Sequence, residues 1–236
     1  MLVMQNILEN LQQVHNQISS SCTSSGRDVS TVKLLCVSKT KPEQMIKEAY
    51  AAGERYFGES YALEAAQKIE SLKSQGFNDI IWHFIGPIQS NKTKHIAAHF
   101  DVVESLDRIK IAQRLSDQRP DDLPPLKVMI QVNISHEDQK QGCDEHEVEE
   151  LIKATSVLPK LEVIGLMGVA RIDADKDELE QSFNSLKALR DRLSATYPNL
   201  TELSMGMTQD LNEAIACGST EVRIGSAIFG AREYHK

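Results

Sequence analysis

The sequence predicts a single (β/α)8 barrel, and three observations carry that prediction. Short β-rich runs alternate with helical patterns along the chain, which is typical of βαβ units around a parallel sheet. Eight such runs occur within about 200 residues, the number of strands that closes a barrel. No Gly/Pro/Ser-rich linker or break in composition divides the 236 residues, so we expect one domain over 1–236.

The chain opens with an amphipathic pattern that predicts a helix ahead of the barrel. Residues 1–17 place apolar side chains at helical spacing and lack the layout of a signal peptide. These apolar residues are Leu2, Ile7, Leu8, Leu11 and Val14. The stretch SSSCTSSGRD, residues 19–28, is rich in serine and predicts a polar loop. Helix and linker together are expected to occupy residues 1–30.

The barrel itself is predicted from eight runs rich in β-branched, aliphatic and aromatic residues. They are 33–39, 55–60, 80–86, 101–106, 126–134, 161–169, 202–207 and 221–230. Between them, apolar residues recur three and four positions apart, as in a helix that buries one face. Examples are Met45, Ile46 and Ala49, then Val148, Leu151 and Ile152, then Leu179, Phe183, Leu186 and Leu193. Each connection is therefore a helix candidate.

Composition narrows the class of partner. The net charge is −8, with 34 acidic against 26 basic side chains, which argues against a general binder of nucleic acid or anionic membranes. No run approaches the roughly 20 apolar residues of a membrane span. The four cysteines are scattered and form no C-x-x-C pair, so we expect free thiols in a reducing cytoplasm. Small molecules become the expected partners.

Lys39 ends the first predicted strand, in LLCVSK. In a (β/α)8 barrel the chemistry lies at the carboxyl ends of the strands, so this amine is expected at the barrel mouth. Partial desolvation there would lower its pKa and favour the neutral amine that attacks a carbonyl to form a Schiff base. The alternative is that Lys39 extends into solvent or pairs with a carboxylate such as Glu59. Position by itself does not decide between the two.

The ends of the last two strands have the composition of a phosphate site. Ser204 and Gly206 follow the seventh run, and Gly225 and Ser226 follow the eighth. Loops after strands seven and eight of such barrels often bind phosphate through backbone N–H groups and hydroxyls. The alternative is that the glycines only serve tight turns. Thr208 is predicted to cap the helix that follows the seventh strand.

Six stretches of the chain resemble the pyridoxal 5′-phosphate homeostasis protein family, a relative of the alanine racemase amino-terminal barrel. They are LLCVSKTKP, RYFGESY, WHFIGPIQSNK, GLMGV, LSMGMTQDLNEAI and VRIGSAIFGAR. The resemblance covers nearly the whole chain and implies a fold-type III barrel that binds pyridoxal 5′-phosphate (PLP). One departure is Ser60, in FGESY, where many relatives have asparagine; its shorter side chain has less reach into a pocket.

The resemblance also implies roles for individual residues. Lys39, in VSKTKP, is expected to form the internal aldimine with PLP. Ser204 and Gly206, in LSMGM, and Gly225 with Ser226, in RIGS, are expected to hold the phosphate. No residue is predicted to bind a metal.

Arg223 is expected to face the pyridine nitrogen of PLP. A guanidinium does not give up its proton, so the ring nitrogen would stay neutral and the cofactor would be a weak electron sink. From the residues alone, Arg223 could instead pair with an acid inside the barrel, such as Glu104 or Asp210. His83 and Asn91 are further pocket candidates, although the first could be a core histidine and the second a helix cap.

The expected function is to bind, buffer and hand over PLP, with little or no racemase activity. In alanine racemases a second domain brings a catalytic tyrosine, and this chain ends about six residues past the eighth predicted strand, which leaves no room for that domain. The expected partners are PLP and possible PLP-dependent client enzymes, and the protein is expected to be a monomer. The alternatives are a PLP-dependent racemase-type enzyme, a cofactor-free Schiff-base aldolase acting on a sugar phosphate, and a non-catalytic interaction module.

Overall fold

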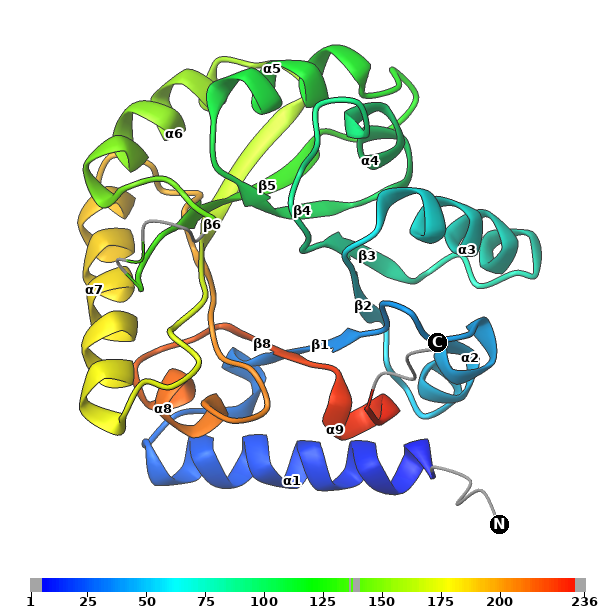
Figure 1. Ribbon diagram of the computed structural model, residues 1–236, viewed down its shortest axis with the longest axis vertical. Coiled ribbons are helices and arrows are strands. Elements are labelled where there is room, and N and C mark those ends of the chain that lie inside the picture. Colours follow the sequence, from blue (N-terminus) through cyan, green and yellow to red (C-terminus); the bar gives the residue numbers. More distant parts are fainter. Residues whose placement is uncertain (1–5, 136, 138–140, 232–236) are drawn as a thin grey trace.

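A computed structural model describes residues 6–135, 137 and 141–231. Eight parallel strands pair in sequence order and close into a barrel, with β8 next to β1. Figure 1 looks along the barrel and shows helices surrounding the ring of strands. The predicted (β/α)8 barrel is therefore confirmed. The strands are β1 Lys33–Val37, β2 Tyr56–Glu59, β3 Ile81–Phe84, β4 Val102–Leu106, β5 Leu126–Val132, β6 Leu161–Gly168, β7 Glu202–Ser204 and β8 Glu221–Ile224.

The strands are shorter than the runs that predicted them. The clearest error is the eighth run, 221–230, because its second half forms the short helix α9, Ser226–Phe229. The ladder between β1 and β8 ends at the pair Cys36 and Ile224, so later residues have no partner strand to extend along. Lys39 likewise lies just beyond the end of β1 and belongs to the turn that follows it.

The helices pack their apolar sides against the outside of the barrel. The main core fills the layer between strands and helices and includes the fully buried rings of Phe57, Trp82, Phe84, Phe100 and Phe183. The remaining helices are α1 Ile7–Ser24, α2 Glu43–Ala51, α3 Ala62–Ser74, α4 Thr93–His99, α5 Ile109–Gln118, α6 Val148–Ser156, α7 Lys176–Ser194 and α8 Leu211–Ala216. Short 3₁₀ turns at Val29–Thr31 and Glu145–Glu147 precede β1 and α6.

Helix α1 lies across the seam where the first and last strands meet, alongside α8 and α9 (Figure 1). The prediction of a polar loop at 19–28 is wrong for residues 19–24, since α1 continues to Ser24, and holds for 25–28. The reason is that the buried side of the helix continues, at Ile7, Leu11, Val14, Ile18 and Cys22. The Ser21 hydroxyl also donates to Asn212 Oδ1 at 2.6 Å, which ties this last turn to α8. Residues 1–5 of the predicted helix lie outside the described residues.

Two predictions from composition can also be compared with the structure. All four cysteines are free, as expected, and the structure also buries all four. Within the described ranges, no helix combines the length and the apolar character that crossing a bilayer would require.

Candidate functional site

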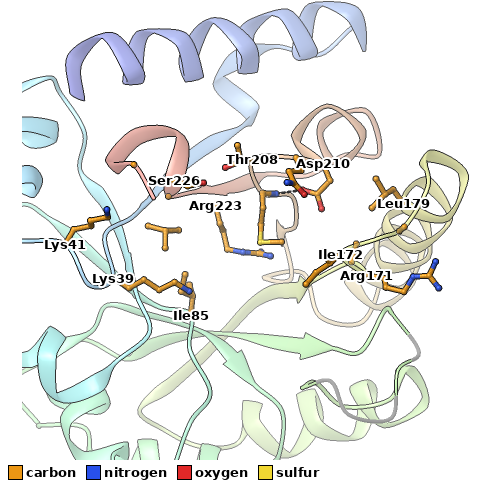
Figure 2. Close-up of a pocket in the computed structure, with 17 residues that line it drawn as sticks. Lys39, Lys41, Ile85, Arg171, Ile172, Leu179, Thr208, Asp210, Arg223 and Ser226 are labelled. Carbon is orange, nitrogen blue, oxygen red and sulfur yellow. Dashed lines mark hydrogen bonds between the residues drawn. The ribbon is translucent and has the colours of Figure 1, made fainter. Parts of the chain in front are cut away.

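A pocket of about 550 Å³ lies at the carboxyl ends of the strands. Its lining comes from strands β1 and β8 and from the segments that follow β1, β3, β6, β7 and β8 (Figure 2). Lys39 and Arg223 both line it, together with Gly225 and Ser226. The barrel thus brings residues from its first and last strands, almost 190 positions apart in the chain, into one cavity.

Lys39 lies at the pocket on the turn between β1 and α2, with its chain running into the cavity in Figure 2. The carboxylate considered as its alternative partner, Glu59, has other close contacts. Glu59 Oε1 accepts hydrogen bonds from the Ser38 hydroxyl at 2.7 Å and from Lys68 Nζ at 2.8 Å. Glu59 therefore contacts Ser38, the residue before Lys39, and Lys68.

The two predicted phosphate loops both reach the pocket, but not through all of the residues predicted for it. Gly225 and Ser226 line it, whereas Gly206 does not. Gly206 has φ of +99°, and a Cβ there would lie 2.5 Å from Ala214 Cβ, so this turn and the close packing of α8 both require glycine. The turn reading of Gly206 thus has structural support, while a direct role in holding a ligand stays a prediction.

The residue at the start of α8 is Asp210, and the prediction that Thr208 caps this helix is wrong. Asp210 Oδ1 accepts a hydrogen bond from the backbone N–H of Met207 at 2.5 Å, which closes the loop after β7. Thr208 lies within that loop and lines the pocket. Helix α8 therefore begins two residues later than a cap at Thr208 would place it.

Ser204 lies in the barrel interior and is fully buried. Its hydroxyl donates to Glu104 Oε2 at 2.6 Å and accepts from Arg223 Nη1, also at 2.6 Å. Arg223 Nη2 donates to the Gly168 carbonyl at 2.9 Å. Arg223 thus reaches Glu104 through Ser204. A phosphate contact from Ser204 stays a prediction, and in this arrangement the hydroxyl is already used by its neighbours.

His83 belongs to the same interior network. Its Nδ1 lies 2.7 Å from Glu104 Oε1 and 3.7 Å from Glu221 Oε1, and the ring is 1% exposed. Lys33, at the amino-terminal end of the barrel, pairs with Glu221 at 3.4 Å. A polar chain therefore runs through the barrel from Lys33 to Arg223 at the pocket. This supports the core-histidine reading of His83.

Burial and close charges shift the pKa values in this network. Burial and the Glu104 carboxylate raise the pKa of Glu221 to about 7, against the opposing effect of His83 and Lys33. For Glu104, burial acts upward, but His83 and Arg223 outweigh it and lower the pKa to about 2. Burial alone would lower the pKa of His83, yet the two carboxylates raise it overall. Of the two buried carboxyl groups, Glu104 is thus the one that is ionised at neutral pH.

The same cluster has the geometry of a possible cation site that the sequence did not indicate. Ligand atoms of His83, Glu104 and Glu221 lie within 4.8 Å of one another. Lys33 and Arg223 already supply positive charge at its two ends. The structure therefore explains the cluster as an internally balanced ion network.

Asn91 is exposed and does not line the pocket. It precedes α4, whose N-cap position is Lys92, with no side-chain capping bond. The helix-cap alternative is therefore wrong, and a pocket role for Asn91 stays a prediction.

Comparison with known proteins gives a consistent picture. Residues 4–233 match the family described as alanine racemase, N-terminal domain. The chain is 46% identical over 233 residues to the pyridoxal phosphate homeostasis protein of Escherichia coli K12, covering 99% of this chain and all of that one. The structure of PipY from Synechococcus elongatus with PLP bound is 32% identical, with a TM-score of 0.81 and coverage of 95% and 100%. An alanine racemase of Clostridium difficile shares the fold alone, at 12% identity, TM-score 0.75 and coverage of 98% and 60%.

Proposed function

The chain belongs to the pyridoxal phosphate homeostasis protein family, and from this premise we propose that its pocket binds PLP for storage and transfer. The observation that carries the proposal is the convergence of Lys39, Arg223, Gly225 and Ser226 on one cavity. A relative of known structure, PipY, has PLP bound.

The residues of the pocket fit the three reactive parts of PLP. Lys39 offers an amine to the aldehyde, and Arg223 offers a permanent cation to the pyridine side. Ser226 offers a hydroxyl to the phosphate, and Gly225 leaves room for close approach of the backbone. The volume of about 550 Å³ lies within the range of about 300–1,000 Å³ that is usual for cofactor sites.

When bound, PLP supplies an aldehyde that condenses with a lysine amine and releases water. Lys39 is the residue proposed to supply that amine, from the wall of the pocket. Arg223 is held in place by Ser204 and by the Gly168 carbonyl, with Glu104 behind Ser204. Because its guanidinium does not give up a proton, Arg223 would face the ring nitrogen without protonating it, which suits carriage more than electron withdrawal.

The finer parts of the proposal concern the state of the protein in the cell. We take it to be a carrier without catalytic turnover, a monomer of one domain over 1–236, present in the cytoplasm. The free cysteines support the last of these. PLP-dependent enzymes are the proposed recipients of the cofactor.

The test is the visible spectrum of the protein with added PLP, before and after borohydride, followed by peptide mass mapping. The expected result is a yellow protein whose reduced pyridoxyl group maps to Lys39 and is lost in Lys39→Ala. Lys41→Ala is the matched control, since Lys41 lines the same pocket and should leave the adduct on Lys39. A colourless protein with unmodified Lys39 would overturn the proposal.

A second assay separates a carrier from an enzyme. Alanine racemisation is measured on PLP-loaded protein and on Lys39→Ala. Turnover close to that of genuine racemases, abolished by the substitution, would replace the carrier by a racemase. If PLP does not bind but borohydride traps a sugar phosphate on Lys39, the aldolase alternative would take its place.

A further inference from the structure

The turn that carries Lys39 is strained at the next residue. Thr40 has φ of 62°, and it is the one non-glycine with positive φ in the part of the chain that the structure describes. β-branched residues rarely adopt this conformation, because Cβ crowds the backbone. Such outliers persist only where surrounding contacts enforce them, and they concentrate at functional sites. The contacts that enforce this one can be identified.

Three charged residues from β2 and α3 hold the backbone on both sides of Lys39. On one side, the Thr40 N–H donates to Glu64 Oε1 at 3.0 Å. On the other, the Ser38 hydroxyl donates to Glu59 Oε1 at 2.7 Å, and Lys68 Nζ donates to the Ser38 carbonyl at 3.3 Å. We call Glu59, Glu64 and Lys68 the β2–α3 clamp.

Lys68 joins the two halves of the clamp. Its Nζ donates to Glu59 Oε1 at 2.8 Å and to Glu64 Oε1 at 3.1 Å. The Lys68 side chain is only 7% exposed and that of Glu59 is fully buried. Buried charges of this kind persist only when they are paired, so each member fixes the position of the others. Glu59 and Lys68 therefore form a fixed buried pair, and Lys68 anchors the partly exposed Glu64.

We propose that the β2–α3 clamp positions Lys39, by fixing the backbone of Ser38 and Thr40 so that the lysine amine is presented to the pocket. This inference rests on the proposed function and assigns positioning residues to it. Its physical basis is that the approach of an amine to a carbonyl carbon depends steeply on placement. The clamp contacts the residues beside Lys39, so its effect is exerted through the turn.

The experiment compares Glu64→Ala with the wild-type chain. The side chain of Glu64 is 39% exposed, so its removal should leave the urea midpoint close to that of the wild type. Two readouts are expected to change. Measured in the absence of PLP, backbone amides of residues 38–41 should exchange hydrogen faster in Glu64→Ala than in the wild type. The rate at which PLP forms its borohydride-reducible bond with Lys39 should fall on the order of 10- to 100-fold.

Two further variants separate positioning from general stability. Glu70→Ala is the matched control, because Glu70 lies on the same helix and pairs with His99 on the surface. It should load PLP at the wild-type rate. Thr40→Gly in the Glu64→Ala background should recover part of the loading rate, since glycine adopts positive φ without the strain that the clamp has to hold.

The outcomes are distinguishable. If the wild type forms no adduct on Lys39, the proposed function fails, and the positioning role fails with it. If the wild type forms the adduct and Glu64→Ala loads as fast as Glu70→Ala, only the clamp proposal is overturned. The clamp proposal is also overturned if Glu64→Ala slows loading in proportion to a lowered urea midpoint and Thr40→Gly restores nothing.

Discussion

Glu221→Gln should change how the stability of the barrel depends on pH. Glu221 is fully buried, and neither of its oxygens makes a hydrogen bond within the described part of the chain. Lys33 and His83 pair with it at 3.4 and 3.7 Å, and Glu104 is a second carboxylate nearby. Burial and Glu104 raise the pKa of Glu221 from 4.5 to about 7.

The raised pKa of Glu221 determines whether the stability of the fold rises or falls with pH. A carboxyl whose pKa is raised on folding favours the fold while it is protonated, so its contribution is full below about pH 4.5 and is lost as the pH rises through about 7. At about 1.4 kcal/mol per pH unit, the difference corresponds to an upper limit of about 3 kcal/mol. Glutamine has nearly the same shape as glutamate and cannot ionise. The variant should therefore not lose stability as the pH rises through about 7.

The assay is urea unfolding of the wild type and Glu221→Gln between pH 5 and 8. The free energy of unfolding of the variant should rise relative to the wild type by up to about 3 kcal/mol across this range. Glu202→Gln is the control, because Glu202 also pairs with Lys33 but is 27% exposed. Its curve should stay parallel to the wild type. Parallel curves for Glu221→Gln as well would refute the reasoning.

Two substitutions at other sites test the packing of the barrel. Ser204→Ala removes the hydroxyl between Arg223 and Glu104 and leaves both buried charges short of a partner, so we expect a loss of about 2–4 kcal/mol in urea unfolding. A smaller loss than that of an ordinary surface serine would contradict it. Gly86→Ala would place Cβ 2.3 Å from the Ser60 carbonyl oxygen and should cost about 1–3 kcal/mol or more. Gly53→Ala, where no atom lies within 4 Å, reports the backbone effect of its positive φ alone.

The strands, and the end of the barrel that carries the pocket, could be predicted because buried strands leave a local pattern of apolar residues in the sequence. Parallel strands covered by helices are apolar over most of their length, and all eight runs contain a strand. Placing Lys39, Arg223, Gly225 and Ser226 near one another then follows from closure of the barrel, which aligns the carboxyl ends of all strands.

Features that depend on partners distant in sequence were not predictable in the same way. Glu104 and Glu221 each lie in a β-rich run, and nothing in either run indicates that both carboxylates meet His83 inside the barrel. The serine-rich end of α1 reads as a loop because its helical state depends on packing against α8. The positive φ of Thr40 likewise depends on Glu64, which lies on another element.

The position of α1 has a consequence for the order of events during synthesis. Asn10 Nδ2 donates to the Ile228 carbonyl at 2.8 Å, a contact between residues 218 positions apart. Synthesis at about 5–20 residues per second separates the two by roughly 10 to 45 s. For most of that interval α1 lacks α8 and α9, although its contact with α2 can form early. Helix α1 can therefore complete its packing only after β8 and α9 have been synthesised, which makes its full docking a late step in folding.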